Sequence, residues 1–286
     1  MQKFIIRDLQ TYQEMLDVLQ LQREIWGLTE SSVGLYPPLL TTAAKNGGVV
    51  LGAFEAETER MIGFLVGILG RQPGGPLKLC SQIMGVKQEW RSWGVGESLK
   101  QAQRARVIAQ DLPLITWTFD PLEGPNAQLN LHKLRGISRT YQRDIYGSHF
   151  GSLNAGLPTD RLFVEWWVQG ERLSRGANHL IDEAEAAPVF VLADQGLAQR
   201  IAHSRLDLTA PALRLDIPAD IQALKKADID LAMDWRMQVR VAFEAYFAQG
   251  YIALDFLSTT AAEERHNRYL LQQATPELMA WIGIGE

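Results

Sequence analysis

The sequence has little of several features that would place it in a specialised class. It holds one cysteine, Cys80, so no disulfide can form within the chain, which is typical of a reducing compartment. The longest apolar run, Met61–Leu69, is far too short to span a bilayer, and the N-terminal MQKFIIRDLQ lacks a signal-peptide pattern. We therefore expect a cytoplasmic protein without a membrane partner.

Charge and metal-ligating residues are also sparse. The 286 residues carry a net charge of −5, with 28 Lys and Arg against 33 Asp and Glu. The sequence has no stripe of basic residues, so we expect no nucleic-acid partner. The 5 histidines and single cysteine show no clustered spacing, so we expect no metal. The acidic excess lies after residue 170, where the composition changes.

The most informative motif that is present lies between residues 79 and 100. An apolar strand, Leu79–Val86, runs into a loop that carries Arg91-x-x-Gly94-x-Gly96, and a helix begins there. The first turn of a helix has N–H groups without intrahelical partners, and its dipole favours an anion. Glycines let a phosphate approach this backbone closely. The spacing therefore predicts a phosphate cradle, or in the plainer alternative a corner with two turn glycines.

Two common nucleotide motifs do not fit this loop. The dinucleotide fingerprint needs a third glycine, where this chain has Leu99, and the P-loop needs Gly-Lys-Ser/Thr, which is absent. The order of predicted elements around the loop favours an α/β or α+β sheet flanked by helices. These predicted elements are strands at 4–8, 49–56, 61–69, 79–86, 113–119, 137–145 and 162–168, and helices at 11–26, 39–45 and 126–134, with a further helix that begins at the glycine loop.

The second part of the chain is predicted with less detail. Residues 180–188 are acidic and alanine-rich and indicate a connector, followed by strands at 189–193 and 213–217. A long helix is expected over 219–249, then a strand at 251–257, and the final 15 or so residues are expected to be loosely ordered.

The loop and the segments after it resemble one enzyme family. An Arg/Gln-x-x-Gly-x-Gly loop after an apolar strand, TWTFDPLEGPNAQLNLHKLRG, SRTYQRDIYG and NAGLPTDRLFVEWW together resemble a bacterial and archaeal subgroup of the GNAT N-acyltransferases. The resemblance covers residues 1–170 and continues more loosely to about residue 260. It implies a mixed, mostly antiparallel sheet flanked by helices. It also implies a GNAT domain at 1–170 and an α/β extension at 171–286, which resembles a partial, degenerate second GNAT half without a second CoA site.

The resemblance implies an enzyme that moves an acyl group from acyl-CoA to a primary amine of a small molecule, such as an amino acid. Acetyl-CoA and succinyl-CoA are both candidate donors, because some members resemble amino-acid N-succinyltransferases. The strand before the loop would bind the pantetheine arm, and the loop and helix start would bind the pyrophosphate. The residues expected to bind the donor are Ile83, Met84, Gly85, Val86, Arg91, Ser92, Trp93, Gly94, Val95, Gly96, Ser98, Asn126 and Asn130.

Candidate catalytic residues follow from the same resemblance. The family usually has a tyrosine four residues before a helix-ending glycine, near the CoA thiolate; here that position, counted from Gly136, is His132. A histidine titrates near neutrality and suits a proton donor, although a surface histidine is the plainer alternative. Tyr141 is an alternative acid, with Tyr146 beside it. Glu165, between Val164 and Trp166, is a candidate base.

Three points stay open on the sequence alone. The chain is either an enzyme or a catalytically silent CoA-binding protein that acts as a sensor or partner module. The acceptor is also undetermined, because an acidic pocket would favour a cationic amine whereas Arg139, Arg143 and Arg161 would favour a carboxylate. The chain is either a monomer or a homodimer.

Overall fold

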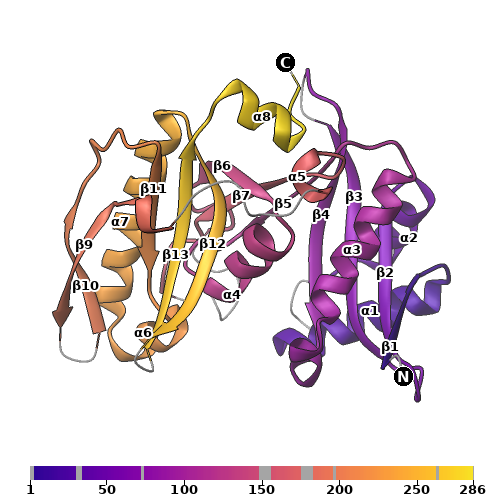
Figure 1. The fold of residues 1–286 in the computed structure, drawn as a ribbon. Coiled ribbons are helices and arrows are strands. Elements are labelled where there is room, and N and C mark those ends of the chain that lie inside the picture. Colours follow the sequence, from indigo (N-terminus) through magenta and orange to yellow (C-terminus); the bar gives the residue numbers. More distant parts are fainter. Residues whose placement is uncertain are drawn as a thin grey trace. The chain divides into compact units, whose positions relative to one another are not determined.

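The computed structural model describes residues 3–29, 34–71, 74–147, 156–174, 183–195, 198–261 and 264–285. Its contacts divide the chain into two compact units, Met1–Trp117 and Thr118–Glu286 (Figure 1). Compactness does not test an evolutionary boundary, so the division expected after residue 170 stays a prediction.

The first unit is built on a sheet with helices on both faces. Strands β1 to β4 pair antiparallel in chain order, and β5 joins β4 in parallel. Helices α1 and α2 cover one face, and α3 covers the other (Figure 1). The bounds are β1 Phe4–Asp8, α1 Tyr12–Trp26, α2 Pro37–Lys45, β2 Val49–Glu55, β3 Met61–Arg71, β4 Leu77–Val86, the 3₁₀ turn η1 Gln88–Trp93, α3 Val95–Ile108 and β5 Leu114–Phe119.

Local signals at both ends of α1 explain why this helix forms where the sequence predicts. The Thr11 side chain accepts a hydrogen bond from the backbone N–H of Glu14. In turn, the Glu14 carboxylate accepts from the backbone N–H of Thr11 at 2.8 Å, which completes a capping box. Gly27 ends the helix with φ +62°, a conformation that glycine adopts without strain. The buried face of α1 then packs on Phe54, Phe64 and Val66 of the sheet.

The second unit has a sheet in the order β7-β6-β12-β13-β11-β8, antiparallel except for the short β11–β8 pair. A separate hairpin pairs β9 with β10. The bounds are α4 Gly124–Ala127, the π-helix η2 Gln128–Lys133, β6 Ile137–Gln142, β7 Arg161–Trp167, α5 Glu171–Ser174, η4 Glu183–Glu185, β8 Ala187–Pro188, β9 Phe190–Gln195, β10 Ala198–Ser204, β11 Ala212–Ile217, α6 Ile221–Ala227, α7 Ile229–Ala248, β12 Tyr251–Ala261, β13 Glu264–Gln273 and α8 Pro276–Ile282.

Aromatic packing joins α7 to the sheet of the second unit. The Tyr269 ring of β13 meets Phe243 of α7 edge to face, with centroids 5.1 Å apart, and meets Phe256 of β12 at 4.8 Å. Such pairs stabilise a core beyond the area they bury. On the opposite face, Ile252 and Leu254 pack against Leu278 and Ile282 of α8. This strand pair is therefore buried on both sides.

The mixed, mostly antiparallel sheet flanked by helices is confirmed in both units. The long helix expected over 219–249 is wrong: Asp228 has an extended backbone, and its side chain caps Leu231, so α6 ends and α7 begins there. The loosely ordered C-terminus is also wrong, because Thr275 caps α8 and Leu278 is buried. Residues 180–182 of the expected connector lie outside the described residues.

Candidate functional site

The feature of the first unit that can receive a ligand is the divergence of β4 from β5. The two strands pair only at Leu79 with Ile115 and at Cys80 with Thr116. Beyond Cys80, the edge of β4 that faces β5 has no ladder bonds to that strand. An extended edge with free N–H and C=O groups can bind an amide-bearing chain as another strand would.

The glycine loop lies at the far end of this edge. Gly94 has φ +75° and begins α3, and the first helical bond of this turn runs from Ser98 N–H to Gly94 C=O at 3.0 Å. The N–H groups of Val95 and Gly96 precede that bond, so α3 does not use them. A Cβ built on Gly94 would meet nothing within 4 Å. The space beside this backbone is open, which fits an anion as bulky as a pyrophosphate.

Side chains around the loop add further donors. Arg91 is exposed, and its Nε donates to the Val86 carbonyl at 3.2 Å, which ties the arginine to the end of β4. Ser92 is exposed as well. Trp93 is 48 % exposed, with the Lys3 ammonium 3.6 Å from the centre of its ring.

The strand residues expected to bind the pantetheine arm lie on both faces of β4. Met84 faces α3, with its Cε 3.5 Å from a Cβ built on Gly96, and Val86 is buried. Ile83 packs toward α1 on the opposite face. Packing explains the glycine at position 85, because a Cβ there would lie 2.8 Å from the Trp26 side chain. Its glycine is therefore required by the core and is not by itself a sign of a ligand.

Two lysines flank the loop, Lys87 and Lys100, and from the sequence both are expected to meet the adenosine 3′-phosphate of a bound CoA. Lys87 pairs with Glu24 at 2.8 Å. Lys100 is only 3 % exposed, and its Nζ donates to Ser81 Oγ at 2.8 Å from the inner face of α3. Lys100 cannot reach a phosphate in solvent at the loop, so that expectation is wrong for this residue.

In the second unit, His132 is held by a carboxylate. It lies in η2, a π-helical turn of the kind often found at functional sites. Its Nδ1 lies 3.0 Å from Asp255 Oδ1, and the imidazole is 41 % exposed. Asp255 also accepts from the N–H of Phe256 at 2.7 Å, next to a bulge in β12. A carboxylate on one ring nitrogen orients the imidazole and leaves the other nitrogen for proton transfer.

The two asparagines of this helix differ in burial. The helix begins after Glu123, so Asn126 is an exposed residue within its first turn. Asn130 is buried, and its carbonyl accepts the N–H of Gly136 at 2.9 Å, which ends the helix. Asn126 is therefore the one of the two whose side chain meets solvent.

Glu165 and Tyr141 are both engaged in structural contacts. The Glu165 carboxylate accepts from Arg139 at 2.8 and 3.1 Å and from Trp167 Nε1 at 3.1 Å. A base needs a free lone pair on the reacting side, and these donors take both oxygens. Tyr141 donates to Asp160 at 2.7 Å, and burial raises the pKa of this phenol far above its ordinary value.

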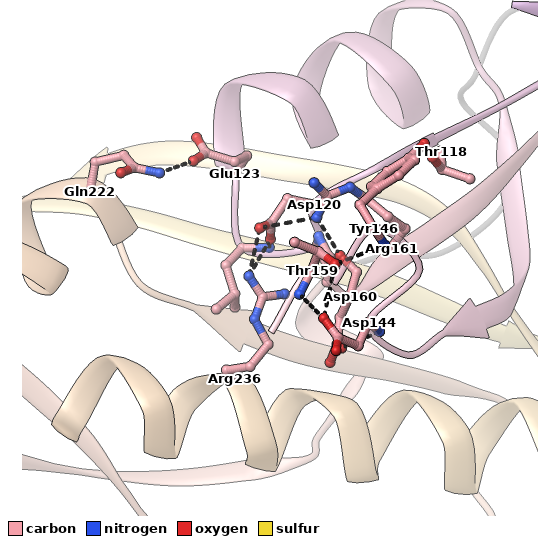
Figure 2. A network of polar contacts seen from close by, with 12 residues as sticks. Thr118, Asp120, Glu123, Asp144, Tyr146, Thr159, Asp160, Arg161, Gln222 and Arg236 are labelled. Atoms are coloured by element: carbon pink, nitrogen blue, oxygen red, sulfur yellow. Dashed lines mark hydrogen bonds and ion pairs between the residues drawn. The ribbon is translucent and has the colours of Figure 1, made fainter. Parts of the chain in front are cut away.

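A network of polar contacts includes Asp120, Asp160 and Arg236 (Figure 2), and Tyr141 joins it through its bond to Asp160. Asp160 is fully buried and accepts from Arg240 through two bonds of 2.8 Å each. Asp120 accepts from Arg236 at 2.6 and 2.7 Å, and the N–H of Leu122 closes a turn on Asp120. Burial lowers the pKa of Arg236, but the charge of Asp120 and the hydrogen bond to it raise this pKa more, so it lies above its ordinary value. These pairs join α7 to Asp120, which directly follows β5, and to Asp160, which directly precedes β7, and this is a structural role.

The arginines considered for a carboxylate-bearing acceptor are paired as well. Arg143 donates to Glu244 at 2.5 and 2.6 Å, and Arg161 lies 3.6 Å from Asp120. Sequence reasoning missed Asp255 and Arg236, because their partners are more than a hundred residues away and no local spacing marks them. The burial of Lys100 could have been read from its spacing with Val95, Leu99, Gln103 and Val107 on one helix face.

Several solved structures are similar to part of this chain. The NatC complex bound to Gag peptide and CoA matches at 12 % identity over 57 % of this chain and 98 % of that chain, with a TM-score of 0.44. An N-acetyltransferase from Staphylococcus aureus matches at 14 % over 59 % and 100 %, TM-score 0.47. A GNAT-family acetyltransferase from Streptococcus pneumoniae matches at 14 % over 57 % and 98 %, TM-score 0.45.

No protein-family model matches the sequence. The comparison with curated proteins also found no match.

Two further features concern the residues that the structure describes. Within them, no helix has the length and apolar character that a bilayer crossing requires. The same part of the chain holds no group of three or more His, Cys, Asp or Glu side chains arranged to bind a metal ion.

Proposed function

We propose that the chain is an acyl-CoA-dependent N-acyltransferase that moves an acetyl or succinyl group to a primary amine of a small molecule such as an amino acid. The observation that carries the proposal is the first unit's pairing of an open glycine loop at the start of α3 with an unpaired edge of β4. A pyrophosphate suits the free N–H groups of Val95 and Gly96, and an amide-bearing pantetheine arm suits the strand edge.

The reaction needs no covalent enzyme intermediate. The amine nitrogen attacks the thioester carbon and releases a proton to water, the carbon–sulfur bond breaks, and the thiolate takes up a proton. We assign the return of that proton to His132, whose imidazole is exposed and oriented by Asp255. Positioned acids of this kind contribute about 10²–10⁴-fold to a rate. Glu165 and Tyr141 are assigned structural roles, because their polar atoms are already bonded.

The experiment is a screen of primary amines with acetyl-CoA and with succinyl-CoA, in which thiol release is followed with a chromogenic thiol reagent. The proposal expects release that depends on both donor and amine. His132→Phe should lose this release and still bind CoA, since the substitution leaves the loop of the first unit untouched. Binding of CoA without amine-dependent release from any amine would support the silent CoA-binding alternative. No binding of CoA would overturn both.

A further inference from the structure

The first unit contains a buried amine that the proposed reaction does not use. Lys100 lies on the inner face of α3 and is 3 % exposed. Its Nζ lies 2.8 Å from Ser81 Oγ, 3.5 Å from Gln103 Oε1 and 3.6 Å from the centre of the Trp117 ring. In the part of the chain that the structure describes, no carboxylate pairs with it. A buried lysine without a counter-ion is expensive, and buried charges are normally paired.

The location of this unpaired lysine points to a ligand. Ser81 is the first residue of β4 after the strand stops pairing with β5, and Trp117 follows Thr116, the last paired residue of β5. The ammonium therefore lies beside the point where the two strands part. Gln103, fully buried one turn further along α3, has an Nε2 with no acceptor. The Lys100 ammonium lacks a negative partner here, and the Gln103 amide N–H lacks an acceptor. A carboxylate would supply both.

A chain-length estimate connects this cluster with the glycine loop. Gly96 lies against Met84 and Val86, so the loop is level with the end of β4. From Val86 back to Ser81 the strand spans about 16 Å. The pantetheine arm has about twelve bonds between phosphate and sulfur, as many as about four residues of extended chain, or ~14 Å. Its sulfur then lies about one residue short of Ser81, and a four-carbon acyl group adds roughly 5 Å.

We propose that Lys100 binds a terminal carboxylate on the acyl group, so that the preferred donor is a four-carbon dicarboxylic acyl-CoA such as succinyl-CoA. This inference rests on the proposed function, because it takes the glycine loop to hold CoA. An acetyl group ends before the lysine, and a butyryl group of the same length as succinyl places a methyl against an ammonium. Lys100 is thus a specificity-determining residue for the donor.

The test measures the affinities of CoA, acetyl-CoA, butyryl-CoA and succinyl-CoA by calorimetry, on the full chain, which requires no knowledge of the acceptor. We expect succinyl-CoA to bind about tenfold or more tightly than butyryl-CoA. Lys100→Met should remove this preference while the affinity for CoA itself stays within about threefold. Methionine fills the same space without a charge, so the variant is expected to fold. Lys45→Met, at an exposed position on α2, is the matched control and should keep the preference.

The outcomes separate the two proposals. If none of the four compounds binds, the acyltransferase proposal fails and takes this inference with it. If CoA binds but succinyl-CoA binds no better than butyryl-CoA, or if Lys100→Met keeps the preference, the role of Lys100 is wrong while the proposed function stands.

Discussion

His132 Nδ1 lies 3.0 Å from Asp255 Oδ1, across 123 residues of sequence, and this contact orients the histidine that we propose as the proton donor. The bulge in β12 next to Asp255 aims the carboxylate at η2. The contact changes the meaning of the histidine. An isolated surface histidine has no fixed ring orientation, whereas one held by a carboxylate presents the opposite nitrogen in a defined direction.

Asp255→Asn tests this orientation. The amide keeps the size of the side chain and removes its charge, so we expect the turnover number to fall by about tenfold to a hundredfold while the KM for acyl-CoA changes little. The measurement is the pair of kinetic constants, with the amine found by the screen. A role that is only structural would instead lower the thermal stability and leave the turnover of the folded protein unchanged. Asp230→Asn, in the first turn of α7, is a matched control.

Glu165→Gln tests whether this carboxylate is a base or a structural partner. The substitution removes the charge that Arg139 faces and leaves the packing of β7 intact, so we expect a loss of about 1–3 kcal/mol in the free energy of unfolding. Denaturant unfolding measures this loss, and the activity per folded molecule should stay within about threefold. A drop in turnover of a hundredfold or more with unchanged stability would show that Glu165 is the base.

Lys100→Met should stabilise the protein, by about 1–4 kcal/mol at pH 7, because an uncompensated buried charge is replaced by an apolar side chain. Burial lowers the pKa of Lys100 from 10.5 to about 7. Between these two values the unfolded chain holds a proton that the folded chain lacks, so the native protein gains stability as pH rises through this window. The groups nearest to Lys100 are Ser81, Gln103 and Trp117, none of which titrates there.

Thermal melting of wild type and Lys100→Met at several pH values checks this account. The advantage of the variant should be largest near pH 7 and should shrink toward pH 10. A constant difference across that range would mean that Lys100 is charged in the folded protein throughout.

Asp160→Asn should cost about 3–5 kcal/mol, because Arg240 would be left without its buried counter-ion. The carboxylate also accepts from Tyr141 and from the backbone N–H of Asp144 at 3.0 Å, so several bonds depend on it. Urea unfolding gives the value. Asp144→Asn removes a carboxylate from the same network at a more exposed position and should cost less. If both variants lost the same free energy of unfolding, burial would not be what makes Asp160 the more costly position.

The sequence predicts most of the local structure of the first unit, because its signals are local. The capping box at Thr11 and Glu14, the glycine that ends α1, and the glycine loop before α3 all lie where periodicity and turn residues place them. The second unit is harder to predict. The helix break at Asp228 depends on one capping side chain within an apolar pattern that continues on both sides, and the pattern alone favours one helix.

The candidate site divides along the same line. Gly94, Gly96 and the edge of β4 follow from a motif. The state of Glu165 could not be read, because its partner Arg139 is set by the register of two strands. The lack of a Cβ at Gly85 makes room for Trp26, a packing contact that no spacing in the sequence indicates. The burial of Lys100 follows from its place on the buried face of α3, whereas its contact with Ser81 depends on how α3 packs against β4, which helical spacing does not indicate.

The measurement that tests the central claim most directly is the affinity of CoA for a variant in which Gly94 and Gly96 are both valine. The branched side chains would cover the N–H groups of the α3 start, so we expect CoA binding to fall by a hundredfold or more, or to be lost. Gly74→Val is the control, because Gly74 also has a positive φ, +74°, and open space around it, in a turn away from the loop. Loss of binding in the loop variant alone is the predicted result. Unchanged CoA binding with both glycines replaced would contradict the account.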